Sequence, residues 1–281
     1  MKSELCSVLT EDGVTLHGAL FEGDPERPAM ILLPGAAMNF YTGMGGFLPE
    51  ILASNGYTCF SANHRGHDFG SAPDGDKKPV IGLIRDRFID CVHDVAGLVR
   101  FLEERGYRKI ILAAHSQSVP KILYAMNALK LPAAEGAVLL SPPPSFDRML
   151  RYLVGDSPYE RLLAKAKELA ELGVYDQLSI VKGRNTMPWI LSTGMVLDYY
   201  SPDTPADVVK LAANAHYPML VVRGERDFDP VSPELMRSIQ ANAALPGACS
   251  LVEIAGADHF YNGREAALGQ AVLDWLGRLE G

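Results

Sequence analysis

The segment IILAAHSQS, residues 110–118, carries more information than any other part of this chain. Its first half is an uninterrupted apolar run, and a helix-like stretch follows it. Ser116 therefore sits at a sharp turn from a strand into a helix, where a side chain stands exposed above a sheet. The pattern small-x-Ser-x-small is a relaxed form of the GxSxG nucleophile turn, and its meaning depends on what the rest of the chain supplies.

The composition of the 281 residues is that of a globular protein. Hydrophobic residues make up 48% of the chain and charged residues 21%, which excludes the disordered and fibrous classes. The formal net charge of −8 and the lack of a long Lys/Arg run argue against nucleic acid or an anionic membrane as partner. We therefore expect a small-molecule partner, and the oligomeric state stays open.

The cysteines and the hydropathy pattern bear on metals and location. Four cysteines lie too far apart for a CxxC zinc site or a disulfide framework: Cys6, Cys59, Cys91 and Cys249. No run of 18 apolar residues occurs, and no apolar core of signal-peptide length follows the first residues. The sequence thus predicts no metal, no membrane insertion and a cytoplasmic location.

Strand patterns alternate with helix patterns along most of the chain. Residues 5–9 and 14–21 predict an antiparallel hairpin, because Asp12-Gly13 between them is a turn signal. Six later apolar runs are typical of strands covered on both faces: residues 29–33, 58–62, 109–114, 137–140, 219–222 and 250–254. Helix patterns include residues 86–104 and 264–279. The order predicts an α/β protein with a mostly parallel, doubly covered sheet and an N-terminal hairpin.

The alternation breaks over residues 143–215, which read as helices and loops without a convincing strand. Helix start signals lie at residues 157–160 and 204–207. We expect this segment to be a helical cap, or lid, inserted into a core domain formed by residues 1–142 and 216–281. Its apolar and aromatic side chains, at least in part, should line a pocket: Met187, Trp189, Met195, Tyr199 and Tyr200.

An activated serine needs a histidine base and a carboxylate that orients the base. Asp227 and Asp229 follow the apolar run 219–222, and Asp258 and His259 follow the run 250–254. Parallel strands deliver such residues to one sheet edge, and Ser, Asp, His is the chain order of one known arrangement of the triad. His259 is the expected base and Asp258 a solvated loop carboxylate, whereas Asp227 and Asp229 both stay open as the orienting acid.

The oxyanion that forms during attack by a serine must be bound by backbone N–H groups. Gln117 supplies one, because an N–H at a helix start has no partner within the helix. A second should come from the loop after the run 29–33, where Gly35 permits an unusual turn. We expect Ala36 to be this donor, with Ala37 as the alternative.

Five motifs in this order resemble the α/β-hydrolase superfamily with a helical cap, over nearly the whole chain. They are Leu33-Pro34-Gly35, the NHRGH motif at residues 63–67, the serine turn, GERD at residues 224–227 and GADH at residues 256–259. The resemblance implies Ser116 as nucleophile, His259 as base and Asp227, rather than Asp229, as the acid, with no cofactor.

The chain departs from the family pattern at three positions. Ala114 and Ser118 replace the two glycines of the serine turn, and small side chains still permit close approach of strand and helix. Pro34 replaces the usual histidine, which alters the loop near the oxyanion site. We expect structural roles for His64, His67 and His115.

A serine nucleophile implies acyl transfer and argues against the dehalogenases and epoxide hydrolases of the superfamily, which use Asp. We expect a carboxylesterase acting on a small, partly apolar ester or related acyl compound. The alternatives are a C–C bond hydrolase or non-hydrolytic lyase on the same triad, and a ligand-binding receptor with the hydrolase fold. Candidate substrate contacts are Ala37, Trp189, Tyr199 and Phe260, while Arg184 or Lys182 could meet a carboxylate.

Overall fold

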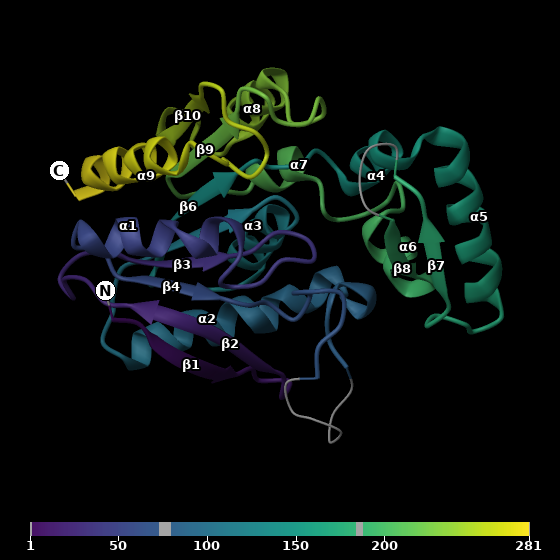
Figure 1. Ribbon diagram of the computed structural model, residues 1–281, viewed down its shortest axis with the longest axis horizontal. Coiled ribbons are helices and arrows are strands. Elements are labelled where there is room, and N and C mark those ends of the chain that lie inside the picture. Colours follow the sequence, from purple (N-terminus) through teal and green to yellow (C-terminus); the bar gives the residue numbers. More distant parts are fainter. Residues whose placement is uncertain (1, 73–79, 184–187, 281) are drawn as a thin grey trace.

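One eight-stranded sheet forms the centre of the molecule, with strand order β1-β2-β4-β3-β5-β6-β9-β10 (Figure 1). The computed structural model describes residues 2–72, 80–183 and 188–280. The strands of this sheet are β1 (Glu4–Leu9), β2 (Thr15–Phe21), β3 (Ala29–Leu33), β4 (Cys59–Ala62), β5 (Ile110–His115), β6 (Ala134–Leu140), β9 (Met219–Gly224) and β10 (Cys249–Ile254).

The pairing confirms a mostly parallel sheet that begins with an antiparallel hairpin. Strand β2 pairs antiparallel with both β1 and β4, and every neighbouring pair from β4 to β10 is parallel. All residues of β3 and β5 are buried, as expected of strands covered on both faces. Loops that follow β3, β5, β9 and β10 therefore leave the sheet at one edge, where ligand sites form in such folds.

Helices cover both faces of the sheet. The side chains of α2 (Cys91–Glu104), α3 (Ser118–Ala128) and α8 (Pro233–Asn242) belong to one hydrophobic cluster with the strands. Those of α1 (Leu48–Ser54) and α9 (Glu265–Glu280) belong to a second cluster, on the opposite face. Trp275 of α9 anchors that face and is almost fully buried.

Helix α2 begins at Cys91, five residues later than the sequence pattern predicts. Two short 3₁₀ turns precede it, η3 (Leu83–Arg85) and η4 (Phe88–Asp90), and Asp86 between them is extended. The buried Asp86 carboxylate bonds to side chains of α3 and of a later helix. These tertiary contacts override the local helical pattern over residues 86–90.

The elements between β6 and β9 differ from the sequence prediction in one respect. They are α4 (Phe146–Val154), α5 (Asp156–Glu171), β7 (Leu178–Val181), β8 (Trp189–Ser192), α6 (Thr193–Tyr199) and α7 (Val208–Ala212). The expectation that this segment has no strand is wrong, because β7 and β8 form an antiparallel hairpin. Both strands have only four residues and no fully apolar run, so their pattern is too short to recognise.

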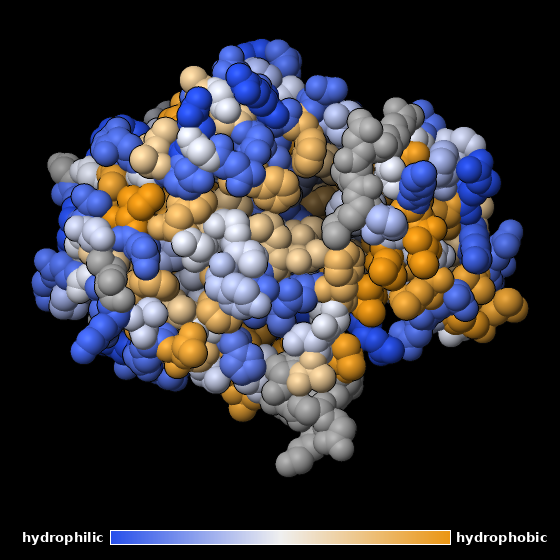
Figure 2. Space-filling model, in the orientation of Figure 1, coloured by the Kyte–Doolittle hydropathy of each residue, from blue (hydrophilic) through white to orange (hydrophobic). Residues whose placement is uncertain are grey.

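We call residues 146–199 the insertion; it projects to one side of the sheet (Figure 1). It has its own hydrophobic cluster, against which Ala36, Ala37 and Phe228 of the loops at the sheet edge pack. In contrast, α7 belongs to the cluster of α3 and α8 on the sheet. Figure 2 shows apolar side chains over β7, where Leu178 and Ile180 are exposed. Within the described ranges, no helix is long and apolar enough to cross a membrane.

Candidate active site

Ser116 occupies the turn between β5 and α3 in a strained backbone conformation. Its φ is +51°, in the left-handed region that non-glycine residues rarely adopt. Such strain persists only where the surrounding structure enforces it, and it concentrates at functional sites. The N–H of Ser116 donates to the carbonyl of Leu140 in β6, and its own carbonyl accepts from Val119, which fixes the turn from both sides.

The structure brings Ser116, His259 and Asp227 together in one hydrogen-bonded chain. The distance from Ser116 Oγ to His259 Nε2 is 3.0 Å, and that from His259 Nδ1 to Asp227 Oδ1 is 2.6 Å. His259 and Asp227 are both buried, whereas Asp229 is exposed. The histidine is thus placed to accept the serine proton, with its other nitrogen oriented by a carboxylate.

Asp227 has hydrogen-bond donors on both carboxylate oxygens. Ser141 Oγ donates to Oδ2 over 2.6 Å, and the N–H of Phe228 donates to Oδ1 over 2.7 Å. Burial alone raises the pKa of Asp227, but the hydrogen bonds and charge of His259, together with the Ser141 bond, hold that pKa below its usual range. The carboxylate is therefore ionised at neutral pH and stabilises a positive charge on His259.

Sequence reasoning missed Ser141 and Tyr261 as supports of this carboxylate. Ser141 follows β6 directly, and the Tyr261 hydroxyl lies 2.9 Å from Ser141 Oγ and donates to the carbonyl of Val222. A polar residue directly after the buried run that ends at Leu140 is a signal that could have identified Ser141.

The loop after β3 lies against the serine turn. The Ser118 hydroxyl donates to the carbonyl of Pro34 over 2.5 Å, and a Cβ on Gly35 would come within 2.7 Å of His115 Nδ1. In the described parts of the chain, neither the Ala36 N–H nor the Gln117 N–H donates to an acceptor. Both N–H groups therefore remain available beside Ser116, and Ser118, which replaces a glycine of the family pattern, ties the two loops together.

The comparisons with known proteins place this architecture. No protein-family model matches the chain, and no curated protein sequence is significantly similar to it. Among solved structures, the α/β hydrolase GrgF from Penicillium sp. sh18 superimposes with a TM-score of 0.72 at 18% identity, covering 99% of both chains. The chain has the α/β-hydrolase fold.

Two esterases show the same likeness to this α/β-hydrolase fold. Est1E from Butyrivibrio proteoclasticus, in a structure with bound ferulic acid, has a TM-score of 0.70 at 19% identity over 96% of this chain and 98% of its own. The esterase domain of a Rhodothermus marinus protein has a TM-score of 0.64 at 16% identity over 99% of both chains. At these identities the likeness concerns the fold.

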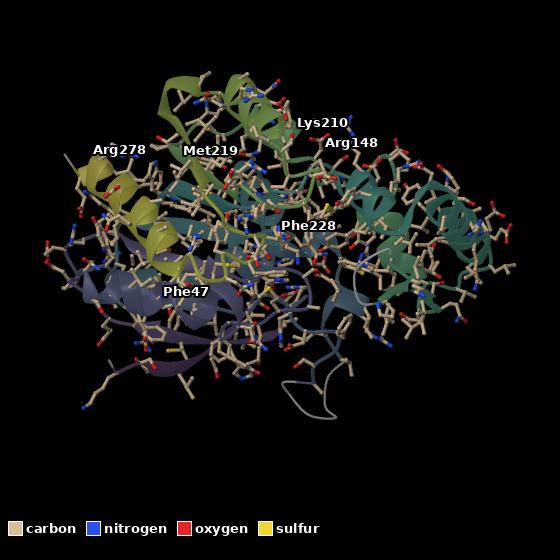
Figure 3. All side chains as sticks on the ribbon, turned by 45° about the horizontal axis from the view of Figure 1, so that its top comes forward. Phe47, Arg148, Lys210, Met219, Phe228 and Arg278 are labelled. Atoms are coloured by element: carbon tan, nitrogen blue, oxygen red, sulfur yellow. The ribbon has the colours of Figure 1, made fainter. Side chains whose placement is uncertain are left out.

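A cavity of about 430 Å³ lies between the sheet edge of the α/β-hydrolase fold and the insertion. Ser116 and His259 line it, as do three of the predicted substrate contacts, Ala37, Trp189 and Phe260. The insertion contributes mostly apolar side chains from α4. Phe228 lies between core and insertion (Figure 3), with its ring centroid 4.5 Å from that of His259.

The structure corrects the prediction that Tyr199 contacts the substrate. Tyr199 is fully buried and its hydroxyl donates to Asp86, away from the cavity, whereas the neighbouring Tyr200 lines the cavity. Lys182 is exposed and does not line the cavity. Arg184 and Met187 lie outside the described residues.

His115 lies behind the triad as a neutral, buried side chain. Its Nε2 lies 2.9 Å from the carbonyl oxygen of His259 and donates to it in the tautomer that this contact requires. Burial, with a smaller contribution from His259, lowers the pKa of His115 to about 3. The ring thus supports the loop that carries the expected base.

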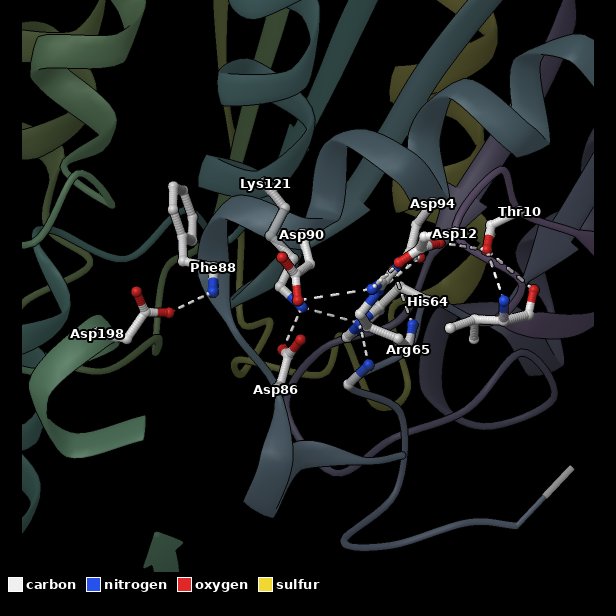
Figure 4. A network of polar contacts seen from close by, with 12 residues as sticks. Thr10, Asp12, His64, Arg65, Asp86, Phe88, Asp90, Asp94, Lys121 and Asp198 are labelled. Atoms are coloured by element: carbon white, nitrogen blue, oxygen red, sulfur yellow. Dashed lines mark hydrogen bonds and ion pairs between the residues drawn. The ribbon is translucent and has the colours of Figure 1, made fainter. Parts of the chain in front are cut away.

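A second buried polar network surrounds Lys121 of α3 (Figure 4). Lys121 Nζ lies 2.5 Å from Asp86 Oδ2 and 2.9 Å from His64 Nδ1, and Tyr199 donates to the same Asp86 oxygen. Burial and the neighbouring Lys121 hold the pKa of His64 well below its usual range. Through Tyr199 the network joins the helix after Ser116 to the insertion.

His67, the remaining histidine of the NHRGH motif, is buried beside Asp68, with Nδ1 2.8 Å from the carboxylate. Among the residues that the structure describes, no three His, Cys, Asp or Glu side chains are grouped closely enough to hold a metal ion. The four cysteines are free and buried.

Proposed function

We propose that this chain is a serine hydrolase that cleaves a carboxylic ester, or a related acyl bond, of a small and partly apolar substrate. The single observation that carries the proposal is the chain of hydrogen bonds from Ser116 through His259 to Asp227, which begins at a strained turn in the wall of an apolar cavity. The α/β-hydrolase fold and the esterases that share it support the ester as the bond cleaved.

In the proposed first half-reaction, Ser116 Oγ attacks the carbonyl carbon while His259 Nε2 takes the hydroxyl proton. The negative charge that forms on the carbonyl oxygen is bound by the N–H groups of Ala36 and Gln117. Asp227 stabilises the imidazolium, which then protonates the departing alcohol as the acyl-enzyme forms.

In the second half-reaction a water molecule attacks the acyl carbon and gives its proton to His259. The same N–H groups bind the second oxyanion, and His259 returns the proton to Ser116 as the carboxylic acid leaves. Water and ester are thus consumed, acid and alcohol are released, and the serine and histidine regain their starting states.

The size and lining of the cavity support a small substrate with apolar groups. A volume of about 430 Å³ lies in the lower part of the range for small-molecule sites. Phe146, Met149 and Leu150 of the insertion face Phe228 and Phe260 of the core loops across it. We propose that residues 143–215 act as a cap that covers the bound substrate.

A fluorophosphonate probe tests the nucleophile directly, because it forms a covalent bond with an activated serine. The wild-type protein should be labelled, Ser116→Ala should not, and Ser238→Ala, which alters an exposed serine of α8, should be labelled at the wild-type rate. Absence of labelling in a folded wild-type protein that binds a small ligand tightly would favour a receptor and overturn the hydrolase proposal.

The bond cleaved is tested with a panel of 4-nitrophenyl esters, thioesters and β-diketones. Turnover of the esters at a rate at least tenfold above that of the diketones supports the esterase. Ser116-dependent cleavage of the diketones alone would instead identify a C–C bond hydrolase.

A further inference from the structure

Gln117 places a primary amide beside the expected nucleophile, and this amide has no partner. Its side chain is 4% exposed, and the residue lines the same cavity as Ser116. Neither Nε2 nor Oε1 forms a hydrogen bond with any described residue, and both atoms lie out of reach of bulk solvent. An amide that is buried and unpaired carries a free-energy penalty, so its presence in an apolar wall calls for an explanation.

Trp189 shows the same feature on the opposite wall. It belongs to β8 of the insertion and lines the cavity, and its indole Nε1–H is buried without a partner in the described structure. His115 Nδ1 is also unpaired, but it abuts the backbone of Gly35 rather than the cavity. The unpaired groups of Gln117 and Trp189 thus offer one acceptor and two kinds of donor to an otherwise apolar space.

We infer that the substrate carries an amide-like group, with a hydrogen-bond donor and an acceptor side by side, within a few bonds of its scissile carbonyl. The Gln117 amide would pair with this group, and the Trp189 N–H would give its acceptor oxygen a second bond. A glutamine amide rotates broadly about its last side-chain bond, so either of its atoms can turn toward the ligand. This inference rests on the proposed function and names the substrate class within it.

The arrangement gives discrimination as well as affinity. A purely alkyl substrate would leave the buried amide unpaired, while an amide-bearing substrate would satisfy it. Sites that present hydrogen-bonding groups reject analogues lacking the complementary groups far more strongly than apolar pockets reject a small change in size. Gln117 is therefore expected to act as a specificity-determining residue through its side chain, independently of its backbone N–H.

The test compares two esters of the same shape, 4-nitrophenyl N-acetylglycinate and 4-nitrophenyl 4-methylpentanoate. The first has an amide where the second has only alkyl groups. The measured quantity is the ratio of their kcat/KM values, compared between the wild type and Gln117→Met. Because both proteins act on the same two esters, the difference in intrinsic reactivity of the esters cancels in this comparison.

We expect Gln117→Met to lower the ratio about tenfold, as befits the loss of one or two hydrogen bonds. Trp189→Phe keeps an aromatic ring but removes the N–H, and should lower the ratio a few-fold. Phe260→Leu alters an apolar wall and should change both kcat/KM values together, which leaves the ratio within about twofold. Gln117→Met should also keep or raise Tm, whereas a fall of several degrees would show that the amide has a structural role.

A ratio that changes less than twofold in Gln117→Met would overturn the inference and leave the proposed function intact, provided that both esters are cleaved in a Ser116-dependent way. Failure to label Ser116 and to cleave either ester would count against the proposed function itself. If turnover is too slow to measure, protection of Ser116 from the fluorophosphonate by the same two esters gives the ratio.

Discussion

Two buried polar networks meet the same helix, α3, and they are completed to different degrees. In the first, Ser116, His259, Asp227 and Ser141 form a chain in which both nitrogens of His259 and both carboxylate oxygens of Asp227 have partners. In the second, Lys121 and Asp86 form a buried ion pair with partners from other elements, yet within the described chain Asp86 Oδ1 and His64 Nε2 have none.

The difference shows what each network contributes. Complete pairing fixes the positions of the first network, so a proton can move between Ser116 and His259 without rearrangement. The second network joins three separate elements, the turn before α2, helix α3 and helix α6 of the insertion. A buried ion pair adds little net stability, but removing one partner leaves an uncompensated charge. Changes in the first network should therefore affect activity, and changes in the second should affect stability.

The largest effect is expected for Asp227→Asn. The amide cannot stabilise a charged His259 and favours the wrong tautomer, so kcat should fall by about four orders of magnitude, as in other serine triads. The control Asp229→Asn alters the exposed neighbouring carboxylate and should keep wild-type kcat. Steady-state turnover of an activated ester measures both, and equal losses in the two variants would contradict the assignment of Asp227.

The next effect is expected in the second network, for Lys121→Met. The variant leaves the buried Asp86 carboxylate without its cation, so the free energy of unfolding should fall by about 3–5 kcal/mol, or roughly 10 °C in Tm. Adding Asp86→Asn removes the stranded charge and should recover most of the loss. Thermal and denaturant unfolding measure both variants, and a double variant less stable than Lys121→Met alone would refute the ion pair as the cause.

A third, smaller effect should appear in the pH dependence of stability. The pKa of buried His115 lies near 3, below the value of about 6.5 in the unfolded chain. Between these values the unfolded state binds a proton that the folded state does not. His115 should thus make the free energy of unfolding fall by about 1.4 kcal/mol per unit as pH drops from 6.5 toward 3.

His115→Asn isolates this contribution, because His64, whose pKa is also lowered, remains and keeps its own pH dependence. Denaturant unfolding at several pH values from 4 to 7 should give a slope smaller by about one proton in the variant. An unchanged slope would mean that His115 is protonated in the folded state.

The sequence predicted the sheet, the serine turn and the meeting of Ser116, Asp227 and His259, because these follow from local patterns. An apolar run marks each buried strand, and parallel strands bring the residues after them to one edge. The second network has no local pattern: Asp86 lies 35 residues from Lys121 and 113 from Tyr199 along the chain. Such contacts are made only by the packing of the insertion on the core.

The error at Tyr199 has a similar physical reason. Tyr199 and Tyr200 are consecutive at the end of α6, and a step of one residue turns a side chain by about 100° around a helix. One ring therefore reaches Asp86 and the other the cavity. Only the orientation of α6 on the core decides which does so, and the sequence pattern does not contain that orientation.

The smallest predicted effect separates the charged from the neutral contacts of the insertion. Tyr199 donates to the Asp86 carboxylate, and Tyr159 of α5, also buried, donates to the backbone carbonyl of Tyr200. A hydrogen bond to a charged group contributes about 1.5–3 kcal/mol and one between neutral groups about 0.5–1.5 kcal/mol. Tyr199→Phe should therefore cost about twice as much unfolding free energy as Tyr159→Phe. Denaturant unfolding of the two variants decides this, since equal losses would show that Asp86 is no stronger an acceptor than a carbonyl and that the insertion is held by apolar packing alone.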